Sequence, residues 1–268
     1  MRLKLIVAYD GSSFAGWQSQ RGGGSIQDAL EVAVLAVVGQ PVRVHGSGRT
    51  DAGVHAAGQC CHIDVAKTRM TPENWIHALN TKLPHQIRIL SAEIVDESFH
   101  ARFSATSKMY RYHVYSGPVL PPMEYQRAWL VREPLDVGRV KRAASLFVGF
   151  HDFSGFSANR GGPAIDTHRM IRKVTVTTRG RSLFFTVVGD GFLYKMVRMI
   201  AAALVDCGRG VLELEKIQAI LGGSEKKSNQ VAPAGGLTLV KVSYGPPARQ
   251  SGERDDETPA DTNSGGCD

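Results

Sequence analysis

Hydrophobic and polar positions in the first half of the chain alternate in a way that predicts strands and helices in turn. Short apolar or alternating runs predict four strands, at residues 3–9, 42–44, 59–65 and 87–95. Apolar residues spaced four apart predict a helix that begins after Ser25, where Asp28 completes a pattern resembling a capping box, and stops at Gly39. Thr71 and Pro72 predict the start of a second helix, because threonine is a good cap and proline fits the first turn. The predicted order is β-α-β-β-α-β.

The second half repeats this order with one extra helix. Its strands are predicted at residues 108–116, 171–178, 183–188 and 237–244. Its helices are predicted after a cap at Asp136, from Tyr194 to about Val205, and over residues 213–221. Each half then matches the split β-α-β, or ferredoxin-like, unit. The same arrangement underlies the four-stranded RNA-recognition module.

We therefore predict an α+β fold built from two ferredoxin-like halves, residues 1–105 and 106–245. Joined edge to edge, they would form one mainly antiparallel sheet with helices packed on it and a central cleft for a ligand. Residues 246–268 have almost no apolar side chains, so they cannot bury enough surface to fold. We predict that they form a disordered acidic tail.

Composition and charge narrow the class of protein. Of the 268 residues, 43% are hydrophobic and 21% are charged, which is typical of a soluble globular protein. No apolar run is long enough to cross a membrane, and the N-terminus lacks the features of a signal peptide, so a cytoplasmic protein is expected. The net charge is +7, and because the tail carries −4, residues 1–245 carry +11. A basic body favours a polyanionic partner, with nucleic acid the first candidate.

Several common chemistries are not indicated. The four cysteines include no C-x-x-C pair, and free thiols fit a reducing compartment. Neither a phosphate-binding G-x-x-x-x-G-K-[ST] loop nor a hydrolase G-x-S-x-G turn occurs. His45, His55, His62 and Asp64 are spaced unlike any zinc class, and scattered histidines are usually structural.

The segment GSGRTDAGVHAAGQ, residues 46–59, carries the first candidate for chemistry, Asp51. Four glycines in fourteen residues indicate a tight loop that another chain or ligand approaches. A lone aspartate in such a loop usually bonds its own turn. Arg198 argues for more, since it is the only polar residue from Met196 to Val205 in a helix that should be buried. A buried guanidinium needs a carboxylate, and Asp51 is a plausible partner, with Asp190 or an exposed position as alternatives.

Arg49, Tyr110 and Phe192 are weaker candidates when each is taken alone. Arg49 lies two residues before Asp51, so it could pair with that carboxylate, contact a phosphate or enter the RNA. Tyr110 and Tyr112 share one face of a predicted strand, where they could be core residues or a stacking surface for a base. Phe192 follows Gly191 at the start of the buried helix, where an anion could approach.

Taken together, these segments strongly resemble the bacterial tRNA pseudouridine synthase A family. The likeness begins with residues 46–59 and extends, in the family's order, over YDGSSFAGWQSQ, SIQDAL, NTKLP, FHARFSATSKMYRY, HDFSGFS, GDGFLYKMVR and APAGGLTLVKVSY. The likeness covers the chain up to Tyr244. The segments are specific to this family when they occur together in this order. The sequence departs from the family at Gly155 and at the Cys60–Cys61 pair, outside the proposed catalytic set.

The resemblance implies a role for each candidate residue. Asp51 would be the catalytic nucleophile, Arg198 would pair with it, and Tyr110 would stack on the target uracil. Arg49 would assist in flipping the nucleotide, and Phe192 is placed with the substrate-binding residues. The family's substrate is uridine at positions 38, 39 and 40 in the tRNA anticodon stem-loop. The resemblance further implies the pseudouridine synthase fold, a homodimer and no cofactor.

The chemistry accounts for these residue types. Pseudouridine forms when the C1′–N1 bond breaks, the uracil turns and C5 bonds to C1′, a redox-neutral change that an ionised carboxylate can assist. An adjacent arginine favours the ionised form, and the uridine must leave the stack to be reached. Whether Asp51 attacks C1′, attacks C6 or removes the 2′ proton stays open. So do two other functions: a non-catalytic RNA-binding protein, and a synthase for other RNA sites.

Overall fold

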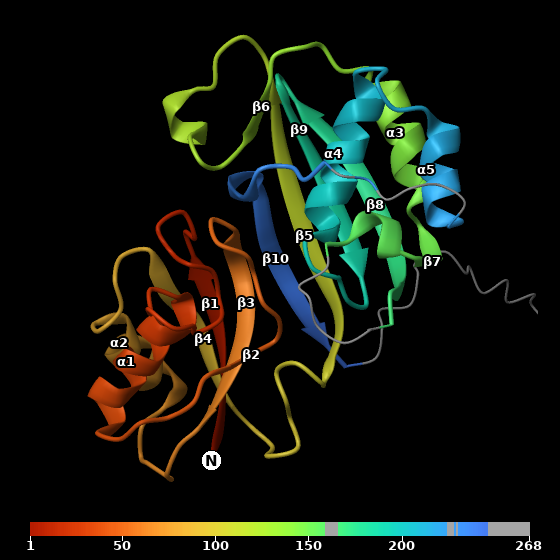
Figure 1. Ribbon diagram of the computed structural model, residues 1–268. Helices are drawn as coiled ribbons and strands as arrows, with labels where there is room; N and C mark the ends of the chain where they lie inside the picture. The colour runs from red at the N-terminus through yellow and green to blue at the C-terminus, as the bar shows by residue number, and fades with distance from the viewer. Residues whose placement is uncertain (159–165, 224–227, 229, 246–268) are drawn as a thin grey trace, which may run out of the picture.

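One sheet runs through the whole molecule. The structure is a computed structural model that describes residues 1–158, 166–223, 228 and 230–245; the predicted tail, residues 246–268, lies outside the described residues. The strands of the sheet occur in the spatial order β4-β1-β3-β10-β5-β9-β8-β7, with β2 added beside β3 and β6 beside β5 (Figure 1). The N-terminal strands are β1 (Arg2–Tyr9), β2 (His45–Gly46), β3 (His55–Asp64) and β4 (Ile87–Val95). The others are β5 (Ala105–Ser116), β6 (Trp129–Val131), β7 (Gly149–Asp152), β8 (His168–Arg179), β9 (Ser182–Gly189) and β10 (Leu237–Tyr244).

Both halves have the same strand arrangement. The N-terminal order is β4-β1-β3-β2, and the C-terminal order β10-β5-β9-β8 repeats it. The halves meet where β10 pairs parallel with β3, with Thr238 opposite His55. Most other pairs are antiparallel, so the predicted α+β fold with two ferredoxin-like halves in one sheet is confirmed. The division into domains at residues 105 and 106 stays a prediction.

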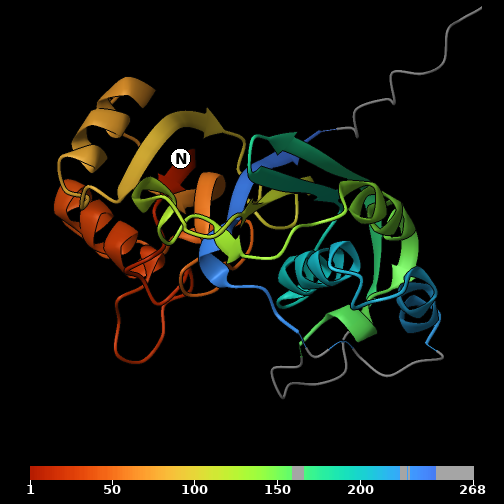
Figure 2. The same ribbon diagram turned by 90° about the horizontal axis from the view of Figure 1, so that it is seen from above.

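The helices pack on the half to which they belong. Helices α1 (Ile26–Val38) and α2 (Pro72–Asn80) cover the first half, and α3 (Val137–Leu146), α4 (Met196–Gly208) and α5 (Leu214–Leu221) cover the second (Figure 2). Ser25 and Asp28 form the predicted capping box of α1, and Thr71 caps α2. Within α4 every residue except Arg198 is buried, as its apolar sequence predicts. No helix of the described residues has both the length and the hydropathy to cross a membrane.

Two of the differences from the sequence prediction have local causes. The expected strand at residues 42–44 is irregular, because its backbone bonds to side chains of α1 instead of to a strand. The Val44 N–H donates to Glu31 Oε1, and Gln27 Nε2 donates to the Val44 carbonyl. Helix α4 starts at Met196 and not at Tyr194, because Lys195 has a left-handed backbone with φ of 60°.

Candidate active site

The glycine-rich loop between β2 and β3 is held from several directions. The Trp17 N–H donates to the Thr50 carbonyl (3.0 Å), and the hydroxyls of Tyr9 and Thr50 are hydrogen-bonded (2.8 Å). A Cβ at Gly46 would collide with the indole of Trp17, and Gly53 has φ of +79°, a conformation that favours glycine. These contacts fix the backbone on either side of Asp51.

The structure brings Asp51 and Arg198 together across 147 positions of the chain. Arg198 Nη1 donates to Asp51 Oδ2 at 3.1 Å, and Arg198 Nε donates to the Ala232 carbonyl at 2.7 Å. The two charged side chains are only 13% and 18% exposed. Asp190, the alternative partner, instead accepts a bond from the Met170 N–H at 3.2 Å. The guanidinium of Arg198 therefore holds the Asp51 carboxylate in a fixed position, as a nucleophile requires.

Tyr110 lies on β5 next to this ion pair and contacts Phe192. The two rings meet edge to face, with centroids 5.1 Å apart and an interplanar angle of 82°. Burial raises the pKa of Tyr110, and the nearby Tyr9 hydroxyl and Asp51 carboxylate raise it further. The phenol therefore stays protonated at neutral pH, so it can donate a hydrogen bond or a proton. Tyr112, on the same face, is a core residue whose hydroxyl donates to the Pro233 carbonyl (2.8 Å).

A cleft of about 730 Å³ opens above these residues, lined by segments of both halves. Asp51, Tyr110, Phe192 and Arg198 all line it. Six cationic side chains are on its walls: Arg43, Arg49, Arg102, Lys108, Lys195 and Arg198. Among the described residues that line the cleft, Asp51 is the single carboxylate. A basic cleft with one acid in it is suited to a polyanionic substrate that reacts at that acid.

Arg49 is exposed on the cleft wall, and its Nε donates to Gln18 Oε1 at 3.1 Å. This position leaves the guanidinium accessible to a substrate entering the cleft. Of the three sequence alternatives for Arg49, a phosphate contact and entry into the RNA both require such access; the third is pairing with Asp51.

Lys108 and Lys195 are among the cleft residues that were not singled out from the sequence. Lys108 Nζ donates to the Ser47 carbonyl of the glycine-rich loop at 2.8 Å. Burial, helped by the charge of Arg102, lowers the pKa of Lys108 to about 8. Strand alternation from Tyr110 could have located Lys108, because residues two apart share a face. The left-handed Lys195 gives no comparable signal in the sequence.

A duplicated ferredoxin-like sheet with one carboxylate in a basic cleft is the architecture of an enzyme that acts on nucleic acid. The chain belongs to the tRNA pseudouridine synthase family, whose sequence model matches residues 5–104 and 143–245. It is 44% identical to the tRNA pseudouridine synthase A of Akkermansia muciniphila over 251 residues, 91% of this chain and 95% of that protein. It is 40% identical to the proteins of the same name from Syntrophotalea carbinolica and Methylacidiphilum infernorum. These alignments cover 91% and 92% of this chain, and 96% and 97% of those proteins.

Proposed function

We propose that this protein isomerises uridine to pseudouridine in the anticodon stem-loop of tRNA, at positions 38, 39 and 40, without a cofactor. The observation that carries the proposal is the Asp51–Arg198 ion pair at the base of a basic cleft, beside Tyr110. The name shared by its relatives supports the substrate. The resemblance to that family also supports a cytoplasmic homodimer.

The reaction assigns each side chain a step. Cationic groups on the cleft wall hold the RNA phosphates while the uridine leaves the stack, with Arg49 assisting. Tyr110 then stacks on the flipped uracil, and Phe192 supports the Tyr110 ring through their edge-to-face contact. Asp51, held in place by its ion pair with Arg198, acts on the nucleoside so that the C1′–N1 bond breaks.

The uracil then turns within the site and C5 bonds to C1′. The proton on C5 leaves and N1 takes one up, so the reaction needs no redox partner. The raised pKa of Tyr110 keeps its proton in place at neutral pH, where the phenol can serve in this exchange.

Release of the C5 hydrogen gives the direct test. A tRNA transcript labelled with tritium at uridine C5 should lose label to water in the presence of the protein, up to the number of modified uridines. When one of the three positions is changed to cytidine, the amount of tritium released should fall by the share that this position contributes. Tight binding of the transcript without tritium release would establish an RNA-binding protein and overturn the proposal. Tritium release that persists when all three uridines are replaced would show that the protein modifies uridines at other RNA sites.

A further inference from the structure

Five side chains form a second aromatic surface on the wall of the same cleft. We call them the rim cluster: His45, His62, His100, Arg102 and Phe103. The His45 ring stacks on His62, with centroids 4.9 Å apart, and His100 contacts both His62 (4.7 Å) and Phe103 (4.4 Å). The guanidinium carbon of Arg102 lies 5.5 Å from the centroid of the Phe103 ring. All except the buried His62 line the cleft together with Asp51 and Tyr110.

The three imidazoles are close enough to suggest a metal site, with one nitrogen of each within 4.8 Å of the others. Their arrangement does not suit one. The rings of His45 and His62 are nearly parallel, at 15°, whereas a shared metal ion must lie in the plane of every ring that binds it. His62 Nδ1 also accepts a bond from the Ala101 N–H, so in a neutral ring the proton is on Nε2 and blocks that nitrogen as a ligand. His100 Nδ1 is likewise an acceptor.

Two of these rings, His62 and His100, have lowered pKa values. Burial lowers the pKa of His62 to about 4, and the charges of Arg2, His45 and His100 act in the same direction. Burial also lowers the pKa of His100, as do His45, Arg2 and Arg102. The rim cluster is therefore an aromatic surface bordered by arginine, in which His62 and His100 favour the neutral ring. Nucleobases stack on surfaces of this kind.

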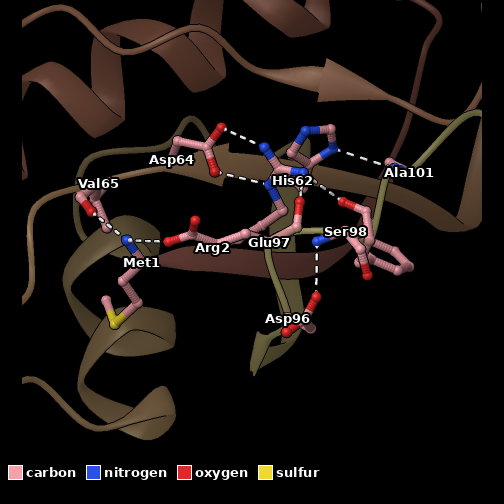
Figure 3. A network of polar contacts seen from close by, with 10 residues as sticks. Met1, Arg2, His62, Asp64, Val65, Asp96, Glu97, Ser98 and Ala101 are labelled. Carbon is pink, nitrogen blue, oxygen red and sulfur yellow. Dashed lines mark hydrogen bonds and ion pairs between the residues drawn. The ribbon is translucent and has the colours of Figure 1, made fainter.

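The backbone that displays Phe103 is fixed. His100 Nδ1 accepts from the N–H groups of Arg102 (3.1 Å) and Phe103 (3.3 Å). The His100 N–H donates to Ser104 Oγ, and the Ser104 N–H donates back to the His100 carbonyl, both at 2.9 Å. Arg2 anchors the preceding segment by donating to the Phe99 carbonyl. It also donates to Asp64, beside His62 (Figure 3). An exposed ring on such a turn loses little freedom when it binds a ligand.

Phe103 is 75% exposed in spite of this support. Single exposed apolar residues are common, but this ring lies in a basic cleft and continues a stack of aromatic side chains. A ligand that fits both features carries phosphates and flat rings. We propose that the rim cluster is a second base-stacking site, which binds an unpaired nucleotide near the target uridine while that uridine occupies the Asp51 site. The inference rests on the proposed function for the identity of the RNA.

Binding of anticodon stem-loop RNA, measured by fluorescence anisotropy, tests the proposal. Phe103→Ala should weaken binding at least about fivefold, the effect of losing one base stack, and Phe103→Trp should restore it. Phe150→Ala is the matched control, because Phe150 is 62% exposed and also stacks on a histidine, His168, but lies outside the cleft lining. That variant should bind like wild type.

A second set of RNAs identifies the base. Each RNA in this set has one loop nucleotide made abasic. For one of them, wild-type protein should lose as much affinity as Phe103→Ala loses for the intact RNA. Phe103→Ala should then bind that abasic RNA no more weakly than wild type does. The stacking site would be overturned if Phe103→Ala bound the intact RNA as tightly as wild type does. It would also be overturned if Phe103→Ala lowered the affinity for every abasic RNA by the same factor. Since the readout is binding, it does not depend on isomerisation: failure of the proposed function would appear as absent tritium release, with these affinities still measurable.

Discussion

Lys108 offers a prediction in which stability and function should move in opposite directions. Its side chain is partly buried, and its ammonium group donates to the Ser47 carbonyl at 2.8 Å. Burial lowers its pKa from 10.5 to about 8, so the folded protein holds this charge at a cost. Replacing Lys108 with methionine removes the charge and keeps an unbranched apolar side chain. We expect the Lys108→Met protein to be more stable at pH 7 and to bind RNA more weakly.

The size of the effect follows from the pKa. Each pKa unit corresponds to about 1.4 kcal/mol, so the shift from 10.5 to about 8 amounts to about 3 kcal/mol. The lost hydrogen bond to Ser47 offsets about 1 kcal/mol. The net gain of about 2 kcal/mol should raise the midpoint of thermal unfolding by about 4–8 °C for a protein of this size.

The pH dependence of the unfolding free energy independently tests the direction of this stability change. Between pH 8 and 10.5 the unfolded chain keeps the Lys108 proton and the folded protein releases it, so wild-type stability should rise relative to the variant as pH increases. The advantage of Lys108→Met should shrink by about 3 kcal/mol across that window. The thiols of Cys60 and Cys207, whose pKa values burial raises to about 11, titrate alike in both proteins and cancel in the difference.

Urea unfolding at pH 7, 8, 9 and 10, followed by circular dichroism, measures these differences. Lys82→Met is the control, because Lys82 is exposed and the substitution changes the charge equally. Unfolding free energies of Lys108→Met that equal those of wild type at every pH would show that the ammonium is not desolvated. The reasoning about this residue would then be wrong.

Three other changes test the rest of the site. Arg198→Met removes the bonds to Asp51 and Ala232, so the free energy of unfolding in urea should fall by about 2–4 kcal/mol and kcat should also fall. An unchanged kcat would show that the ion pair has no part in the reaction. Tyr110→Phe should bind RNA normally yet turn over slowly if the hydroxyl moves a proton, and Tyr110→Ala should also bind less tightly; full activity of Tyr110→Ala would remove it from the site. Because residues 1–245 carry +11, raising salt from 50 to 200 mM should weaken stem-loop binding at least about tenfold, and salt-independent affinity would contradict an electrostatic cleft.

Local sequence signals predicted much of this fold because the interactions behind them are local. Ser25 and Asp28 bond to each other across one turn, so their spacing alone located the start of α1. Strands β4 and β10 begin and end at the predicted residues, since period-two patterns reflect which face is buried. Residues 42–44 misled the prediction because their partners are side chains of α1, which a strand pattern does not reveal.

The site was harder to predict than the elements that carry it. The apolar sequence around Arg198 indicated a buried cation that needed an acid, and the structure places Asp51 against it. The cleft, however, depends on how β3 and β10 join the two halves, and no local signal records that pairing. For the same reason the position of Phe103 in the cleft was not foreseen, whereas strand alternation from Tyr110 could have located Lys108. The catalytic roles of Asp51, Arg198, Tyr110, Arg49 and Phe192 stay predictions until they are measured.

Asp51→Asn tests the central claim most directly. The amide keeps the size of the side chain and removes its charge, so repulsion of phosphate falls while the nucleophile is lost. We predict that the folded variant, checked by its melting curve, binds the anticodon stem-loop at least as tightly as wild type. It should release no tritium from a transcript labelled at uridine C5. If Asp51 were only a turn residue, asparagine would substitute well and activity would survive. Tritium release by folded Asp51→Asn protein at a rate near that of wild type would contradict the account.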